Sequence, residues 1–137
     1  MALENICENV EIDGVEISGG VYEINSIKVK RSYSAIKDFG ALGKRLADSL
    51  NKPSNQIGKD WRLLEAGPDK SYVVSGFFDE GKNSYHGYCV VVDSAGLDFC
   101  QYDFRKNGMP WKIKGKALVL EFQLKWLVDT LVGGSDV

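Results

Sequence analysis

Four extended segments follow one another between residues 60 and 105, and only short connections separate them. The connections hold glycine together with proline, aspartate, asparagine or serine, which are residue types that favour tight turns. Two parallel strands need a crossover of about a dozen residues or more, and none of these connections is that long. The four segments therefore predict an antiparallel meander, with strands at about residues 60–66, 71–79, 84–93 and 97–105.

Residues 1–31 form a second extended region, which is acidic. An Asp-Gly pair at residues 13–14 stands between alternating apolar residues and predicts a two-residue hairpin turn. Farther along, the alternation changes phase at residues 25–26, which predicts a bulge or a tight turn there. Residues 1–27 carry 6 acids and no base, a net charge of −6, whereas the rest of the chain carries 17 − 13 = +4. Such an asymmetry is typical of a chain with a charged partner or of one that self-associates.

Two segments show the spacing of three and four between apolar residues that is typical of an amphipathic helix. The first lies within residues 32–51, where Ser34 is the expected N-cap because its oxygen can accept from amides of the first turn. Each glycine of this segment, Gly43 among them, costs about 1 kcal/mol relative to alanine, so we expect the helix to approach a neighbour closely. The second segment covers residues 117–132, and its first four residues, 117–120, fit a strand equally well.

Together these segments predict an α+β protein: a twisted antiparallel sheet of about five to seven strands with two amphipathic helices packed on one face. A chain of 137 residues fits a single domain, residues 1–137. No apolar run approaches the roughly 18 residues that span a membrane, and no signal-peptide pattern opens the chain, so we expect a cytoplasmic protein without membrane contact. The chain has three cysteines, no CxxC pair and one histidine, so we expect reduced, partly buried thiols, no metal site and no cofactor.

The two faces of the meander follow from the alternation of side chains along each strand. We expect Asp93 to lie opposite Asp98, and Asp79 opposite Ser84. This register predicts that an apolar side around Cys89 lies under the helices and that a polar, aromatic side faces away from them. The candidate ligand-binding residues are those of the polar side, together with one tryptophan of the following connection: Ser75, Phe77, His86, Tyr88, Gln101, Asp103, Arg105 and Trp111.

The residues of the polar side favour a binding module over an enzyme. They include a serine, a histidine and an aspartate, but neither a nucleophile elbow nor an oxyanion-hole pattern surrounds Ser75. We therefore expect a non-catalytic module for a small ligand or a protein partner. The alternative is a small enzyme that uses His86 with Asp103 as acid and base. Phe122 and Trp126 lie off the leucine stripe of the second helix, which predicts a protein interface and favours a homodimer.

A basic connection between residues 105 and 116 supports another alternative. Its cations are interleaved with aromatic and apolar residues, and cations neutralise phosphates while aromatic rings stack on bases. The overall charge of −2 counts against a dedicated nucleic-acid binder, so this alternative is not favoured. It predicts binding of single-stranded nucleic acid by Arg105, Lys106, Lys112, Lys114 and Lys116.

Overall fold

The computed structural model describes residues 9–52, 57–79, 84–105, 111–112 and 116–133 of the chain. For residues 77–79, 84–86, 102–105 and 111–112 it describes the backbone alone. Eight strands and two helices occur in this part of the chain. In chain order they are β1 (Val10–Ser18), β2 (Val21–Lys30), α1 (Phe39–Asn51), β3 (Arg62–Ala66), β4 (Lys70–Asp79), β5 (Ser84–Asp93), β6 (Gly96–Arg105), β7 (Trp111–Lys112), β8 (Ala117–Leu120) and α2 (Glu121–Gly133).

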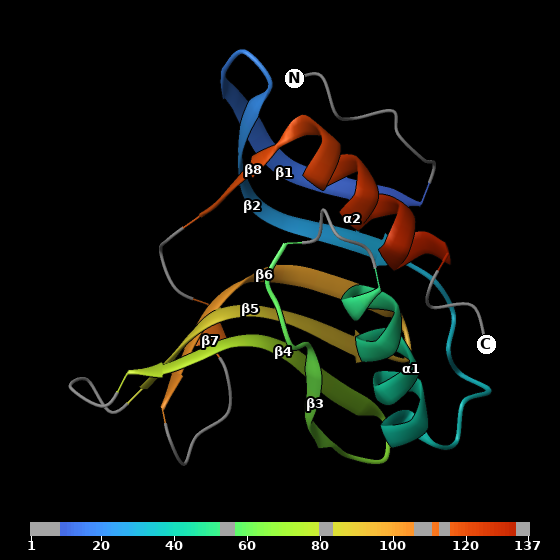
Figure 1. The fold of residues 1–137 in the computed structure, drawn as a ribbon. Coiled ribbons are helices and arrows are strands. Elements are labelled where there is room, and N and C mark those ends of the chain that lie inside the picture. Colours follow the sequence, from blue (N-terminus) through green and yellow to red (C-terminus); the bar gives the residue numbers. More distant parts are fainter. Residues whose placement is uncertain (1–8, 53–56, 80–83, 106–110, 113–115, 134–137) are drawn as a thin grey trace.

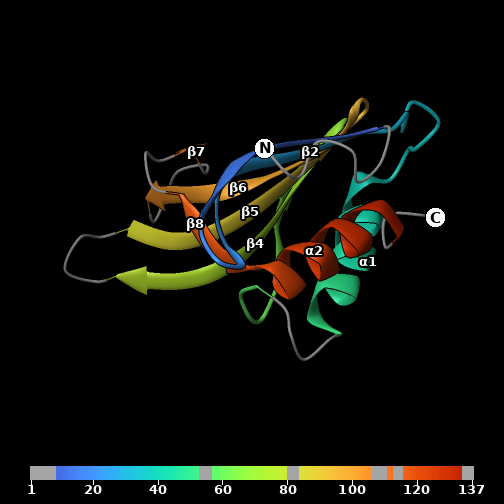
Figure 2. The same ribbon diagram turned by 90° about the horizontal axis from the view of Figure 1, so that it is seen from above.

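The strands form one antiparallel sheet, and its main order is β1-β2-β6-β5-β4-β3 (Figure 1). The short strands β8 and β7 lie off this path, where β8 pairs with β2 and β7 pairs with β6. The four strands of the predicted meander are present as β3 to β6, and each pairs with its neighbour in sequence. Figure 2 shows both helices on the same side of the twisted sheet. The predicted α+β class is therefore confirmed.

The predicted hairpin turn at residues 13–14 is wrong, because β1 runs through it without a break. The chain reverses instead at Gly19-Gly20, where Gly20 has a φ of 74° in the left-handed region that glycine tolerates best. At Gly14 an added Cβ would lie only 2.8 Å from the carbonyl oxygen of Glu23, so this glycine permits a close approach of two strands. The predicted bulge is confirmed: Asp13 pairs with residue 26 and Gly14 with residue 24 of β2.

Helix α1 begins later than the sequence predicts. Asp38, rather than Ser34, is its N-cap, and the Asp38 carboxylate accepts a hydrogen bond of 3.0 Å from the amide of Ala41. The hydroxyl of Ser34 lies 3.1 Å from that of Ser32, outside the helix. A Cβ on Gly43 would lie 2.7 Å from the side chain of Leu63, so the predicted close approach of this helix to a neighbour is confirmed.

The core lies between the two helices and one face of the sheet. Helix α2 begins only at Glu121, because residues 117–120 form β8, so the strand reading of those residues is the correct one. Leucines from both helices meet valines and Phe99 of the meander. The central residues of this cluster, each at most 1% exposed, include Leu46, Leu50, Val73, Val90, Phe99, Leu124 and Leu127.

The face of the sheet that the helices cover is the opposite of the predicted one. Cys89 was expected under the helices, but it belongs to a separate small cluster with Val74, whereas Val90 belongs to the main core. Adjacent residues of a strand point to opposite faces, so Cys89 lies on the far side of the sheet. Alternation does not distinguish the two faces here, because residues 88–92 of β5 are apolar or aromatic at every position. The charged residues near the strand ends therefore predict the wrong face.

Candidate functional site

The register of the β5–β6 hairpin differs by two residues from the predicted one. Asp93 lies opposite Gly96 rather than Asp98, so the turn is shorter than expected. The short turn needs glycine at position 96. Its φ of 145° is rare for other residues, and an added Cβ would lie only 2.0 Å from the carbonyl oxygen of Val29. A shift of two residues keeps every side chain on its face, so the predicted neighbours stay on a common side. The predicted pairing of Asp79 with Ser84 is confirmed.

Three of the predicted site residues form one row across the meander. Ser75 of β4 lies opposite Tyr88 of β5, and Tyr88 lies opposite Gln101 of β6. The backbone positions of the next row lie two residues farther along each strand, where the pairing extends to the short strand β7. That next row consists of Phe77, His86, Asp103 and Trp111.

The side chains of this second row lie outside the described part of the structure, as does that of Arg105, whose backbone lies opposite Ser84. Among the predicted nucleic-acid residues, Lys106 and Lys114 lie outside it entirely, and Lys112 is described by its backbone in β7. Lys116 is described fully, and its ammonium group lies 3.4 Å from the carboxylate of Glu23. That contact joins the basic segment to the acidic N-terminal region at one residue pair.

A pocket of about 360 Å³ opens over the row of Ser75, Tyr88 and Gln101. It lies on the same face as the main core, because Val73 and Val90 occupy the preceding positions of that face in β4 and β5. Part of its lining is therefore strand, and the rest comes from the loop that precedes β3. The residues that line it are Gly58, Lys59, Asp60, Ser75, Gly76, Gly87, Tyr88 and Gln101.

The loop beside the pocket is held to the sheet by the hydroxyl group of Ser75. This hydroxyl donates to the carbonyl oxygen of Lys59 at 2.5 Å and accepts from the Lys59 amide at 2.7 Å. Ser75 is only 2% exposed, so the pair of hydrogen bonds is screened from water. Gly58 must be glycine here, because its φ is 77° and an added Cβ would lie 2.5 Å from the Ser75 hydroxyl.

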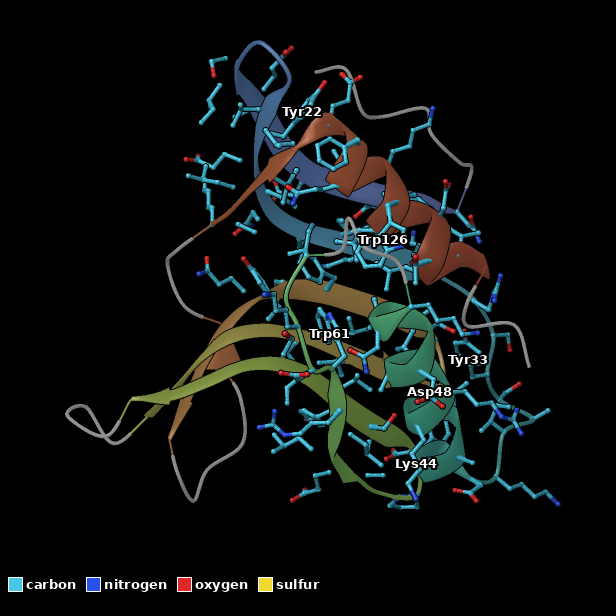
Figure 3. The ribbon with its side chains drawn as sticks, viewed as in Figure 1. Tyr22, Tyr33, Lys44, Asp48, Trp61 and Trp126 are labelled. Atoms are coloured by element: carbon cyan, nitrogen blue, oxygen red, sulfur yellow. The ribbon has the colours of Figure 1, made fainter. Side chains whose placement is uncertain are left out.

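A second pair of hydrogen bonds fixes the end of this loop to helix α1. The side chain of Asn51 accepts from the amide of Trp61 at 2.8 Å and donates to its carbonyl oxygen at 2.8 Å. The indole of Trp61 lies over the sheet beside α1 (Figure 3) and donates to the carbonyl oxygen of Ile57 at 3.0 Å. Between these anchors, Asp60 has a φ of 56°, which few non-glycine residues adopt. Such conformations persist where the surrounding contacts enforce them, and they concentrate at binding sites.

Tyr88 forms the boundary between the pocket and the core. Its ring stacks between those of Trp61 and Phe99, with ring centres 6.4 Å and 5.7 Å away. Burial raises the pKa of the Tyr88 hydroxyl above the ordinary value, because the phenolate would lose its hydration. Tyr88 is therefore a neutral group near the pocket at physiological pH, able both to donate and to accept a hydrogen bond.

The remaining polar groups of the pocket complement one another in chemistry. Lys59 supplies a cation and Asp60 an anion, and both side chains are exposed. The side-chain oxygen of Gln101 is buried and has no hydrogen-bond partner among the residues that the structure describes. A buried amide oxygen without a partner costs about 1–3 kcal/mol, which makes it a candidate acceptor for a ligand donor. Within the described ranges, no three His, Cys, Asp or Glu side chains gather as a metal site would require.

The two cysteines in the described part of the chain lie directly opposite each other. Cys89 and Cys100 pair across β5 and β6, and both are free and buried, as predicted for reduced thiols. Burial raises the pKa of Cys89 far above its ordinary value, and the neighbouring Cys100 and Asp98 add to this effect. Because the thiolate is the reactive form, Cys89 is poorly suited to act as a nucleophile.

Sequence reasoning found the strand side of the pocket but missed its loop side. The sequence predicts residues 58–59 only as the end of a polar loop at residues 51–59 and residue 60 as the start of the strand at residues 60–66. The available signal was the order Gly58-Lys59-Asp60, because glycine and aspartate are residue types that tolerate a positive φ. The hydrogen bonds that give this loop its shape join it to Ser75, 16 residues away in sequence, and no local pattern predicts them.

No family model, no curated protein and no solved structure matched this chain in the three comparisons with known proteins. In the described part of the chain, neither helix has the length and apolar character needed to cross a membrane.

Proposed function

We propose that this protein is a non-catalytic binding module whose ligand is a small polar molecule held in the pocket over Ser75, Tyr88 and Gln101. The observation that carries the proposal is the loop at residues 57–61. Two pairs of hydrogen bonds hold it in a left-handed backbone conformation beside a cavity, which gives a preformed wall. A preformed site binds better because less conformational entropy is lost on association.

The size and polarity of the pocket define the class of ligand. A volume of about 360 Å³ lies at the lower end of the range of known small-molecule sites, which is roughly 300–1,000 Å³. The ring of Tyr88, stacked between Trp61 and Phe99, gives the pocket an apolar surface, and Lys59, Asp60 and Gln101 offer a cation, an anion and a buried acceptor. A small molecule with both an aromatic or aliphatic part and hydrogen-bonding groups of both kinds would complement this lining.

A fragment screen by ligand-observed NMR tests the proposal, followed by titration of the best hit against matched variants. Lys59→Ala removes a charge at the pocket, and Lys44→Ala removes the same charge from the exposed side of α1 (Figure 3). We expect Lys59→Ala or Gln101→Met to weaken binding by about tenfold, which is about 1.4 kcal/mol, while Lys44→Ala leaves it unchanged. If all three variants bind the fragment with equal affinity, the pocket is not the binding site.

The other expectations from the sequence stay predictions. A homodimer through α2 is favoured by the exposure of Phe122, at 49%, whereas Trp126 packs against the core and contributes less surface. Sedimentation equilibrium of the wild type and Phe122→Ser tests it. The cytoplasmic location, the nucleic-acid alternative at residues 105–116 and the enzyme alternative with His86 and Asp103 likewise await measurement.

A further inference from the structure

Strand β1 forms an open edge of the sheet and contributes no residue to the lining of the pocket. It pairs with β2 on one side, and no strand of the described residues pairs with its other side. The amide of Lys30 donates to the carbonyl oxygen of Asn9 at 2.9 Å. Because alternate residues of an antiparallel strand direct their backbone groups to opposite sides, Val10 and Ile12 present their N–H and C=O groups at the open edge. Such an edge is a template for one more strand.

An apolar patch lies next to this edge, on the sheet face that points away from the helices. Val15 pairs with Glu23 of β2, and Glu23 pairs with Leu118 of β8, so these three residues share a face. On the opposite face lie Tyr22 and Val119, which belong to the main core. The large apolar side chains left exposed in this corner are Val15 (48%), Ile17 (50%), Leu118 (61%) and Leu120 (43%).

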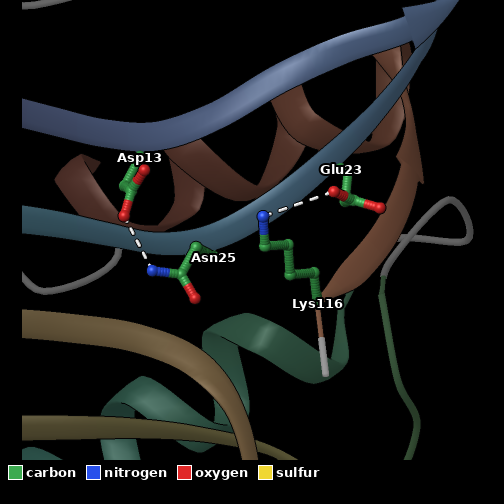
Figure 4. A network of polar contacts seen from close by, with 4 residues as sticks. All are labelled: Asp13, Glu23, Asn25 and Lys116. Atoms are coloured by element: carbon green, nitrogen blue, oxygen red, sulfur yellow. Dashed lines mark hydrogen bonds and ion pairs between the residues drawn. The ribbon is translucent and has the colours of Figure 1, made fainter. Parts of the chain in front are cut away.

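Strand β1 is acidic along its length: it contains Glu11, Asp13 and Glu16 and no basic residue. Local hydrogen bonds hold two of these carboxylates in place. Asp13 accepts from the side chain of Asn25 at 2.7 Å, as Figure 4 shows, and Glu16 accepts from the amide of Gly20 at 3.0 Å. The edge therefore presents negative charge in an ordered arrangement, next to the apolar patch.

A second copy of the chain is a poor occupant of this edge. If two copies paired through Ile12, or through Val10 and Ile12, Glu11 of one copy would lie beside an acid of the other, and like charges at opposed positions destabilise a strand pair. The apolar patch has four exposed side chains, whereas a stable dimer interface uses roughly 20–30 residues on each side. The acids also disfavour an anionic membrane surface. A cationic strand has none of these disadvantages.

We propose that β1 binds an extended segment of a partner protein, which adds a strand to the sheet and carries lysine or arginine opposite Glu11 and Asp13. The residues of that segment that lie beside Val10 and Ile12 are apolar, because these two residues pack on the core. Its residues near Val15 and Ile17 are apolar as well, because they cover the exposed patch. Main-chain hydrogen bonds supply affinity in this mode of recognition, and the side chains supply selectivity.

Binding of a labelled nine-residue peptide, measured by fluorescence anisotropy, tests this proposal. The peptide has lysine at the two positions opposite Glu11 and Asp13 and valine at the others, including those beside Val15 and Ile17. The matching peptide has glutamate in place of the two lysines. We expect the lysine peptide to bind at least tenfold more tightly, with an affinity that falls as salt is added. The double variant Glu11→Gln/Asp13→Asn should abolish the preference, and the control Asp48→Asn/Asp129→Asn, on exposed helix positions, should keep it. Equal binding of the two peptides to the wild type would overturn the proposal.

A backbone variant separates strand addition from general attraction between charges. Ile12→Pro removes the N–H at the open edge without removing a bond to β2, and Ile12→Ala loses most of the same side chain but keeps the N–H. We expect Ile12→Pro to bind the lysine peptide at least tenfold more weakly than Ile12→Ala does. Circular dichroism of both variants establishes that they are folded. If the two bind alike, the peptide does not extend the sheet, and the proposal fails.

Two further measurements decide between this occupant and the others. Sedimentation equilibrium should show that Ile12→Pro and the wild type have the same association state, and a dimer lost only in Ile12→Pro would assign the edge to a second copy. The protein should not bind phosphatidylcholine vesicles. Vesicle binding that is lost in Leu118→Ser would assign the apolar patch to a lipid surface. Either of these results would overturn the proposal.

Discussion

The same face of the meander carries a dry core at one row and a pocket at the next. Val73, Val90 and Phe99 lie side by side on β4, β5 and β6, and each is 0% exposed. Two residues farther along, the row of Ser75, Tyr88 and Gln101 opens into a cavity. The strands are continuous, so the difference comes from what covers them: the helices cover the first row, and the loop at residues 57–61 covers only part of the second.

Truncating one side chain in each row should give the largest difference between the core row and the pocket row in the free energy of unfolding that is lost. Phe99→Ala should lower the free energy of unfolding by about 3–5 kcal/mol, because it leaves a cavity in a closed core. Gln101→Ala should lower it by less than about 1 kcal/mol, because its amide oxygen has no partner to lose within the described residues. Urea unfolding followed by tryptophan fluorescence measures both. Comparable losses would mean that the pocket row is part of the core.

The close packing of α1 against the sheet can be tested by substituting the glycines of this helix. A Cβ on Gly43 would lie 2.7 Å from Leu63 and 3.0 Å from the hydroxyl of Ser71, so Gly43→Ala should destabilise the fold by about 1–3 kcal/mol despite the better helix propensity of alanine. At Gly40 an added Cβ would lie 3.3 Å from the Asp38 carboxylate, at its nearest contact. Gly40→Ala should therefore cost less. Thermal unfolding of both variants compares the two losses of stability. A larger loss for Gly40→Ala than for Gly43→Ala would contradict the close packing of the helix against the sheet at Gly43.

The wall of the pocket depends on Ser75. Ser75→Ala removes both hydrogen bonds to Lys59, and we expect a loss of about 1–2 kcal/mol together with a local loss of order. Amide hydrogen exchange should become faster at residues 58–60 and stay unchanged at Phe99. If exchange rises evenly across both regions, the serine supports the whole sheet rather than the loop.

Alkaline pH should produce the smallest of these effects. Burial raises the pKa of Tyr88 in the folded state, so between the unfolded and the folded pKa only the unfolded state loses the proton, and stability falls as pH rises. Below about pH 10 Tyr88 keeps its proton in both the folded and the unfolded state, so it adds no pH dependence to the free energy of unfolding. Tyr88→Phe should therefore show a smaller drop in unfolding free energy between neutral pH and about pH 11 than the wild type does. Equal drops would show that Tyr88 does not titrate differently on folding.

The antiparallel arrangement of the meander could be predicted from the sequence, because turn residues and segment lengths are local properties. The strand side of the pocket was also predictable, because alternation groups Ser75 with Tyr88 across a tight hairpin and an error of two residues in register does not change a side chain's face. What covers each face was not predictable. Residues 88–92 are apolar or aromatic on both faces, so the helix-covered side could be learned only from tertiary packing.

The helix start and the loop show the same limit at shorter range. Ser34 and Asp38 are both good capping residues, and the choice between them depends on where the chain leaves β2 and meets the sheet. The loop at residues 57–61 takes its shape from Ser75 and Asn51, and neither contact leaves a pattern in the local sequence.

The most direct test of the ligand site is a map of amide chemical-shift changes for the uniformly ¹⁵N-labelled protein with the best fragment from the screen. We expect the largest changes at residues 58–60, 75–76, 87–88 and 101, with little change at β1 and on α1. Changes concentrated on α2, β1 or another surface, with the pocket residues unmoved, would contradict it.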